Sequence, residues 1–188
     1  KVLQQRLGIT TLYVTHDQEE ALSLSDQVVV MAHGRVQQVG SSDEIYLRPE
    51  SRFVAEFVGD ANLLPAEVLS VREGTVLAKV LGQELELHLP AGTMPQVGSA
   101  GHAMVRPEQV LLLLPQAAAE AGWHTEATVR SHAFFGAYER YWLELPGVAE
   151  AWLVDVPLVS GGASVAGRGV PGERIHIALR AGSACWVA

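Results

Sequence analysis

Residues 9–20 read Ile9-Thr10-Thr11-Leu12-Tyr13-Val14-Thr15-His16-Asp17-Gln18-Glu19-Glu20, so an apolar, β-branched run ends abruptly in a histidine and several acidic residues. This composition is typical of a strand buried on both faces of a sheet, which we expect over residues 9–15. Asp17 and Glu20 have the spacing of a capping box and predict a helix from Gln18 to about Leu24. His16 would then lie in a strand-to-helix turn, where open α/β sheets bind their ligands. The alternative is a loop histidine with an ordinary hydrogen bond.

The next forty residues continue with short, well-punctuated elements. Residues 26–40 contain two apolar runs joined at His33-Gly34, which predicts a hairpin. Ser41 opens a helix that ends near Pro49, because the serine has a glutamate three residues later. Residues 51–58 carry apolar pairs four positions apart and predict another helix, with Gly59 as its stop. The expected order is therefore strand, helix, hairpin, helix, helix.

From about Asp60 the pattern changes to short segments in which apolar and polar residues alternate, and this change predicts a domain boundary. The alternating segments are 76–80, 85–89, 127–129, 141–145, 152–156 and 175–179. Segments of this length, separated by glycine and proline, are typical of a small barrel or sandwich with one face inward. The fold class is thus mixed, with residues 1–59 in one domain and an all-β domain over residues 60–188.

The first part resembles a known family, the ATP-binding subunits of ABC importers, in the maltose, ferric-iron, polyamine and phosphonate branch. The matching segments are Val14-Thr15-His16-Asp17-Gln18-Glu19-Glu20-Ala21, Leu24-Ser25-Asp26, Gly34-Arg35-Val36-Gln37-Gln38-Val39-Gly40, Glu44-Ile45-Tyr46, Arg48-Pro49 and Phe53-Val54-Ala55-Glu56-Phe57-Val58-Gly59. The resemblance implies that residues 1–59 are the end of a P-loop α/β nucleotide-binding domain. It also implies that His16 is the switch histidine, which contacts the γ-phosphate of ATP. An imidazole can donate to a phosphoryl oxygen as charge develops there.

Residues 60–188 resemble the TOBE domain, an OB-fold-like regulatory barrel that follows the nucleotide-binding domain in those subunits. The matching segments are Val105-Arg106-Pro107-Glu108, Phe134-Phe135-Gly136-Ala137-Tyr138, Tyr141-Trp142-Leu143 and Pro171-Gly172-Glu173-Arg174. Arg106, Glu108 and Tyr138 are therefore candidate interface or regulatory residues, although Arg106 and Glu108 could equally be an isolated surface pair. The four tryptophans either form a stacking platform for a ligand or fill the barrel core, which is their commoner role.

The chemistry of a P-loop ATPase is incomplete in this sequence. Phosphoryl transfer in that class needs a Gly-rich loop followed by lysine, but the lysines are Lys1 and Lys79, and neither follows a glycine. The acidic strand end that binds Mg²⁺ and activates water should precede the histidine strand, where only residues 1–8 stand. Ser160-Gly161-Gly162 resembles the ABC signature but stands in a Gly-rich segment that predicts a loop. We expect a carboxyl-terminal piece of a longer ATPase that uses ATP and Mg²⁺, with neither bound to this chain and no hydrolysis by it alone.

Composition excludes several other classes. The net charge of −8 argues against a nucleic-acid partner, because such binding neutralises phosphates with lysine and arginine. Cys185 is the single cysteine, so no internal disulfide is expected and a reducing compartment is favoured. No apolar run approaches the roughly 18–20 residues that a membrane helix needs, so direct membrane insertion is not expected. The seven histidines have no metal-ligand spacing, and no metal site is predicted.

Two functions remain open at this stage. In the first, the parent protein couples ATP hydrolysis to import of ferric iron, a polyamine or a phosphonate. It would work with a second copy of itself and with transmembrane permease subunits, on the cytoplasmic face of the plasma membrane. In the second, the chain is a stand-alone module that binds a small ligand or another protein, without ATP chemistry. The apolar edges at residues 10–14 and 28–30 also predict dimers or exchanged strands in the isolated chain.

Overall fold

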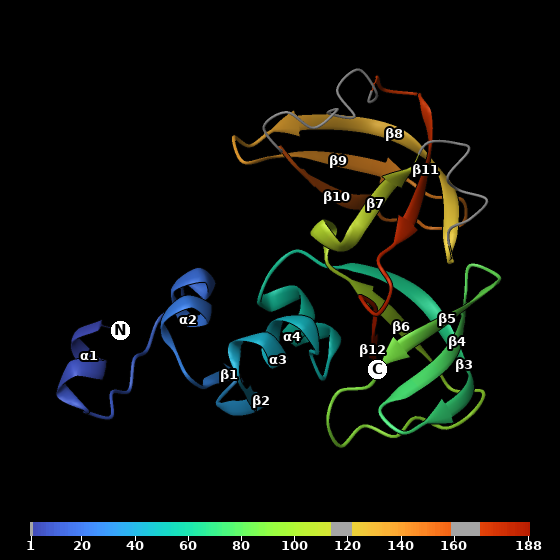
Figure 1. Ribbon diagram of the computed structural model, residues 1–188. Coiled ribbons are helices and arrows are strands. Elements are labelled where there is room, and N and C mark those ends of the chain that lie inside the picture. Colours follow the sequence, from blue (N-terminus) through green and yellow to red (C-terminus); the bar gives the residue numbers. More distant parts are fainter. Residues whose placement is uncertain (1, 114–121, 159–169) are drawn as a thin grey trace.

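The computed structural model describes residues 2–113, 122–158 and 170–188, and shows short helices and a hairpin followed by strands (Figure 1). The first elements are α1 (Val2–Leu7), α2 (Gln18–Leu24), β1 (Val28–Ala32), β2 (Arg35–Gly40), α3 (Ser42–Leu47) and α4 (Arg52–Phe57). The later elements are β3 (Asn62–Arg72), β4 (Thr75–Val80), β5 (Gln83–His88), β6 (Ala100–Val105), the 3-10 turn η1 (Pro107–Gln109), β7 (Val110–Leu113), β8 (His124–Phe134), β9 (Tyr138–Glu144), β10 (Trp152–Pro157), β11 (Arg174–Leu179) and β12 (Cys185–Val187). The loop predicted around Ser160-Gly161-Gly162 lies outside the described residues.

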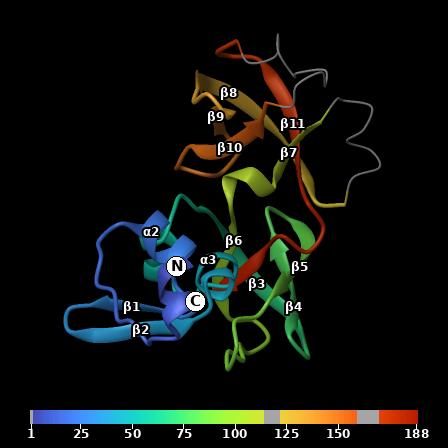
Figure 2. The ribbon, with the colours of Figure 1, turned by 60° about the vertical axis from the view of Figure 1, so that its left-hand side comes forward.

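The strands form a closed barrel and a second sheet, which lie one above the other in Figure 1 and remain distinct in Figure 2. The barrel has the strand order β12-β5-β4-β3-β6 and closes because β12 pairs with β6. The second sheet has the order β10-β9-β8-β11-β7. The chain leaves the barrel after β6, builds the second sheet, and returns to the barrel with its last strand. The predicted barrel is confirmed, and the second sheet is an addition to that prediction.

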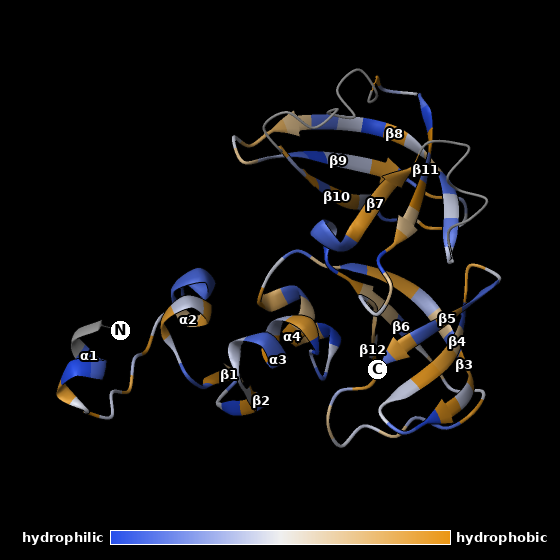
Figure 3. Cartoon of the chain, in the orientation of Figure 1, coloured by the Kyte–Doolittle hydropathy of each residue, from blue (hydrophilic) through white to orange (hydrophobic). Residues whose placement is uncertain are grey.

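The predicted alternation explains the core of the strand region. Val76 and Val80 in β4, Leu143 in β9 and Val154 in β10 are fully buried, while their neighbours along each strand face outward or lie at the rim. The same alternation appears as orange and blue bands along the strands in Figure 3. One apolar cluster extends through both the barrel and the second sheet. The two sheets are therefore held together by a shared core.

The tryptophans belong mainly to this core. Trp123, Trp152 and Trp186 are buried, and the rings of Trp123 and Trp152 lie 5.9 Å apart. Trp142 is half-buried on the other face of β9. Three of the four side chains therefore serve as packing, as the commoner role of such residues predicts, and do not form a surface platform.

The caps and turns expected in the first sixty residues are present. Asp17 accepts a hydrogen bond from the backbone of Glu20 at the start of α2, although the Glu20 carboxylate turns away to Tyr13 and Thr15. Ser41 forms a complete capping box at the start of α3. His33 and Gly34 both have positive φ angles, as the tight turn of the β1–β2 hairpin requires. Local side-chain chemistry therefore fixes these elements.

The strand predicted for residues 9–15 is wrong for this structure. The segment is an irregular link between α1 and α2, and no strand in the described part of the chain pairs with it. Leu12 and Val14 are 90% and 88% exposed, and the apolar link lies apart from the strand region in Figures 1 and 3. A strand needs neighbouring backbone groups to complete its hydrogen bonds, and the described residues supply none here.

Candidate functional site

His16 lies at the entry to α2, one residue before the N-cap Asp17. Its side chain is exposed, and the apolar link that precedes it is exposed as well. Lys79, the lysine of the described residues, lies in β4 and so in the barrel. The part of the chain that the structure describes therefore presents a free imidazole but no loop that could cradle phosphates around it. These residues do not by themselves fit ATP and Mg²⁺.

Arg106 makes the most extensive set of polar contacts in the described residues. It follows β6 and precedes η1, and the residue is only 1% exposed. Its Nε and Nη2 donate to the carbonyl of Tyr46 at 3.0 and 2.8 Å. Its Nη1 lies at 2.9, 3.0 and 2.8 Å from the carbonyl oxygens of Ala55, Gly59 and Asp60. One guanidinium thus contacts four carbonyls, which come from α3, from α4 and from the link between α4 and β3.

The positions of these carbonyls explain why an arginine is placed here. Tyr46 is in the last turn of α3 and Ala55 is in the last turn of α4. The last four carbonyls of a helix have no partner within the helix, and the negative end of the helix dipole lies there. The planar guanidinium supplies several donors in a fixed geometry and carries a positive charge. Arg106 therefore caps two helix ends at once.

Tyr46 and Glu108 complete this arrangement. The guanidinium carbon of Arg106 lies 4.1 Å from the centre of the Tyr46 ring, and the Tyr46 hydroxyl donates to Glu108 Oε1 at 3.1 Å. Burial raises the pKa of Tyr46 to about 12, with a further contribution from the Glu108 charge. Burial also lowers the pKa of Arg106, while the nearby Tyr46 and Glu108 act in the opposite direction. We call Arg106, Tyr46 and Glu108 the Arg106 bracket.

The surroundings of Arg106 and Glu108 differ from those of an isolated surface pair. An isolated surface pair is wrong, because Arg106 is buried and its contacts reach 46 to 60 residues back along the chain. Both side chains instead contact Tyr46 of α3, so they lie where the α3–α4 segment meets the start of the second sheet. Their role as interface or regulatory residues stays a prediction. The sequence motif identified the two residues, but Tyr46 as their partner could be found only from the fold.

Tyr138 belongs to a separate group on the second sheet. It stacks on Phe135 with ring centres 5.3 Å apart and planes 7° apart, across the β8–β9 turn. Arg140 lies 5.7 and 5.6 Å from the centres of these two rings. Its Nε and Nη2 also donate to the two carboxylate oxygens of Asp155 at 2.7 Å, and its Nη1 donates to the Asp60 carboxylate. The Asp155 hydrogen bonds are the main cause that raises the pKa of Arg140.

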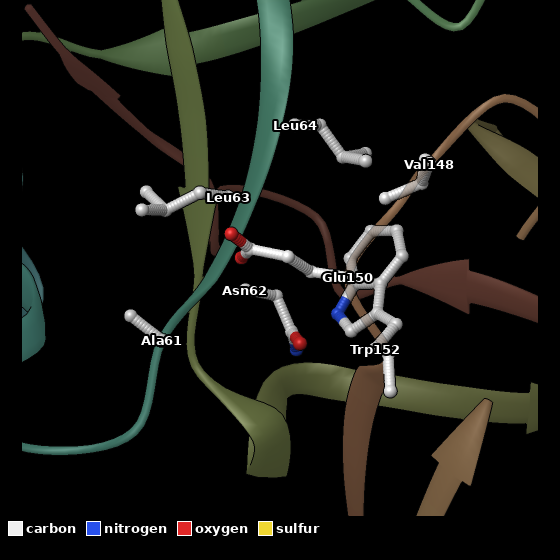
Figure 4. Close-up of a pocket in the computed structure, with 8 residues that line it drawn as sticks. Ala61, Asn62, Leu63, Leu64, Val148, Glu150 and Trp152 are labelled. Atoms are coloured by element: carbon white, nitrogen blue, oxygen red, sulfur yellow. The ribbon is translucent and has the colours of Figure 1, made fainter. Parts of the chain in front are cut away.

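Two hollows on the surface are either too small or too open to enclose a solute. The first lies where β3 meets the loop before β10, and Figure 4 shows the Trp152 indole nitrogen turned toward Asn62 and Glu150. Its volume is about 20 Å³, which is room for about one water molecule. The second, of about 370 Å³, opens widely to solvent beside Arg130, Ser131 and Trp142.

Asn62 itself has a structural role in this seam. Its side-chain amide donates to the Leu153 carbonyl, and its oxygen accepts from the Leu153 N–H, both at 2.7 Å. The side chain therefore behaves like one more strand residue and joins the barrel to β10. Nothing in the alternating sequence pattern indicated this contact.

The described residues lack two further kinds of feature. No three histidine, cysteine, aspartate or glutamate side chains gather there in a way that could hold a metal ion. None of the helices described has the length and apolar content that crossing a membrane demands.

The strands that follow Arg106 match a known family. Residues 103–187, from the end of β6 to β12, match the family model of the TOBE domain. Those residues form a TOBE domain. A structure of the cytoplasmic molybdate-binding protein ModG, with molybdate bound, superimposes with a TM-score of 0.55 and 17% identity, over 68% of this chain and 95% of that one. This likeness shows that the chain shares its barrel-like fold with that protein.

Relatives extend the similarity beyond the TOBE domain. The spermidine/putrescine import ATP-binding protein of Rubrobacter xylanophilus is 40% identical over 190 residues, which cover 100% of this chain and 45% of that protein. The Fe(3+) ions import ATP-binding protein of Brucella abortus is 43% identical over 142 residues, 76% of this chain and 38% of the relative. A sulfate/thiosulfate import ATP-binding protein of Chromobacterium violaceum is 54% identical over 112 residues, 60% of this chain and 28% of the relative.

These relatives confirm the resemblance seen in the sequence. The chain corresponds to the carboxyl-terminal, TOBE-containing part of ABC importer ATP-binding subunits, and it spans less than half the length of the curated relatives it matches. Their names include polyamine, ferric iron and sulfate as imported solutes.

Proposed function

We propose that the chain is part of an ATPase subunit that couples ATP hydrolysis to the import of a small solute. The observation that carries this proposal is the 40% identity to a polyamine importer's ATP-binding protein over the whole of the chain, because it covers the His16 region as well as the TOBE domain. Residues 1–59 would be the end of the nucleotide-binding domain and residues 60–188 the regulatory domain. A polyamine, ferric iron or a phosphonate is the expected solute, and the relatives add sulfate to this range.

His16 is the residue that this chain would contribute to nucleotide chemistry. Its exposed imidazole at the start of α2 is free to meet a phosphate held by residues outside the chain. Asp17 caps the helix behind it and keeps the turn in place. The 188-residue sequence contains no Gly-x-x-x-x-Gly-Lys motif, so we expect no ATP hydrolysis by this chain alone.

The TOBE region would act as a brace for the end of the nucleotide-binding domain. The Arg106 bracket supports this role, because it joins α3 and α4 to the strands through a buried charge. Arg106 and Glu108 are thus proposed as residues of an internal interface. Tyr138 is proposed as part of the surface through which the regulatory region contacts its partners. The proposed partners are a second copy of the subunit and transmembrane permease subunits, at the cytoplasmic face of the membrane.

The test is ATP hydrolysis by the complete subunit with His16→Ala. Loss of a donor aimed at a reacting phosphate costs on the order of 100-fold in rate, and this is the expected loss in turnover. His33→Asn is the matched control, because His33 is also exposed and asparagine tolerates its positive φ. An unchanged turnover number in the His16→Ala variant would remove the basis for the nucleotide-site role.

A further inference from the structure

Asp60 is held from two sides by two arginines. It lies between the end of α4 and the start of β3. Its carbonyl accepts from Arg106 Nη1 at 2.8 Å, and its carboxylate accepts from Arg140 Nη1. Arg106 also holds the Ala55 carbonyl in the last turn of α4 at 2.9 Å. Asp60, in the four-residue link between α4 and the barrel, is therefore tied to the second sheet as well.

The guanidinium of Arg140 is held in a fixed orientation from which it binds the Asp60 carboxylate. Two hydrogen bonds to Asp155 fix the plane of its guanidinium, and its side chain is only 16% exposed. A fixed guanidinium loses little side-chain entropy when it binds a second carboxylate. The Asp60 carboxylate itself is 51% exposed, so this ion pair is expected to be modest and not a major source of stability.

The exposed β8–β9 turn contacts the same arginine. Phe135 and Tyr138 stack on each other across the turn, and both rings lie within 6 Å of the Arg140 guanidinium carbon. Phe135 is 51% exposed, so another molecule can reach this pair. A change at the turn therefore has a direct route to Arg140, and from Arg140 to Asp60 and the end of α4.

We propose that Asp60 is a latch through which the β8–β9 turn controls the order of the last turn of α4. When Tyr138 is displaced, Arg140 loses part of its packing and its hold on the Asp60 carboxylate weakens. The Asp60 carbonyl then moves more freely against Arg106, which also caps α4. The latch is a property of the chain's own contacts and does not depend on nucleotide, so it can fail or hold independently of the ATPase proposal.

Amide hydrogen exchange tests the latch, with a double-mutant cycle between the turn and Asp60. Tyr138→Ala is expected to speed exchange of the Val58 amide, which closes the last turn of α4, by about threefold, equivalent to about 0.6 kcal/mol. Asp60→Asn removes the carboxylate but keeps the backbone carbonyl, and it is expected to speed the same amide by a similar factor. In the Asp60→Asn background, Tyr138→Ala should add nothing further.

Two controls keep the result interpretable. Glu126→Gln removes the exposed Arg174–Glu126 ion pair on neighbouring strands and should leave α4 unchanged. Amides of β4 in the barrel report global unfolding. The proposal is overturned if Tyr138→Ala has no effect on α4, if its effect is the same in both backgrounds, or if β4 and α4 accelerate equally.

Discussion

Arg106 is the residue on which the link between helices and strands depends most. Replacing it with leucine would leave the carbonyls of Tyr46, Ala55, Gly59 and Asp60 without their donor in a buried site. Breaking such a buried charged network costs about 3–5 kcal/mol. We predict a loss of this size in the free energy of unfolding of Arg106→Leu, measured by urea titration.

Two other variants give this measurement its controls. Arg106→Lys keeps the charge but cannot reproduce the planar set of donors, so an intermediate loss is expected. Arg174→Gln changes an arginine that is 78% exposed, and should alter stability by less than about 0.5 kcal/mol. A loss in Arg106→Leu no larger than in Arg174→Gln would contradict the bracket.

Tyr46 gives the bracket a predictable pH dependence. The pKa of Tyr46 in the folded chain is about 12, whereas the pKa of a tyrosine in an unfolded chain is about 10. A raised folded pKa means that the stabilising contribution is complete below about pH 10 and is lost as the pH rises toward 12. The free energy of unfolding should therefore fall between these values.

The Tyr46→Phe variant isolates this effect, since phenylalanine cannot ionise. Its stability curve should be flatter than wild type between about pH 10 and 12. Tyr141, whose pKa burial also raises to about 12, contributes a second part of the fall, so the double variant with Tyr141→Phe should be flatter again. Equal slopes in wild type and Tyr46→Phe would show that the tyrosine hydroxyl is not buried in the bracket.

At the scale of elements, closure of the barrel depends on Gly101 in β6. A Cβ at this position would lie 2.4 Å from the Trp186 ring and 2.9 Å from the Val187 carbonyl in β12. Overpacking of this kind costs about 1–3 kcal/mol, and here it opposes the strand pairing that closes the barrel. Gly101→Ala is predicted to lose that much stability in thermal or urea unfolding followed by circular dichroism.

Gly122 provides the matched substitution for Gly101. A Cβ there would meet nothing within 4 Å, and its φ lies outside the left-handed region. Gly122→Ala should therefore leave the unfolding midpoint nearly unchanged. Similar midpoints for the two variants would mean that β12 does not pack on β6 as described.

Helix caps and turns that are formed by side chains close together in the sequence could be predicted from the sequence. The cap of α2 at Asp17, the capping box at Ser41 and the turn at His33-Gly34 depend on side chains a few residues apart, and all are present. The strand predicted for residues 9–15 is absent because a buried strand depends on neighbouring strands elsewhere in the chain. Local composition does not show whether such neighbours exist. Strand β3 was also missed, since a proline, Pro65, stands within it and a bulge after Val68 interrupts its alternation.

Only some residues of the candidate site could likewise be identified from the sequence. The motif at residues 105–108 and the motif at residues 134–138 pointed to Arg106, Glu108 and Tyr138. Tyr46 and Asp60, which contact Glu108 and Arg106, lie 62 and 46 residues away along the chain. Arg140, which lies beside the Tyr138 ring, binds Asp60 and Asp155 from 80 and 15 residues away. Residue type and spacing therefore identify one side of each contact, while the tertiary structure is needed for the other side.

At the scale of the whole molecule, the apolar link between α1 and α2 predicts self-association. Leu12 and Val14 are 90% and 88% exposed and belong to a segment with a strand-like sequence. Such segments tend to pair with other chains. We predict dimers or larger species in light scattering of the 188-residue chain, and a shift toward monomer when both residues are changed to lysine. A clean monomer of the unmodified chain at high concentration would contradict this.

The central proposal is that this chain is part of an ATPase subunit whose phosphate-binding loop would lie in another part of the same polypeptide. The most direct measurement is the DNA sequence of the reading frame upstream of the Lys1 codon. The proposal predicts that this frame encodes a Gly-x-x-x-x-Gly-Lys-Ser/Thr loop, because the proposed contact of His16 with a γ-phosphate requires a loop that holds the phosphates. A frame that begins near Lys1, with no such loop, would contradict the account and favour a binding module without ATP chemistry.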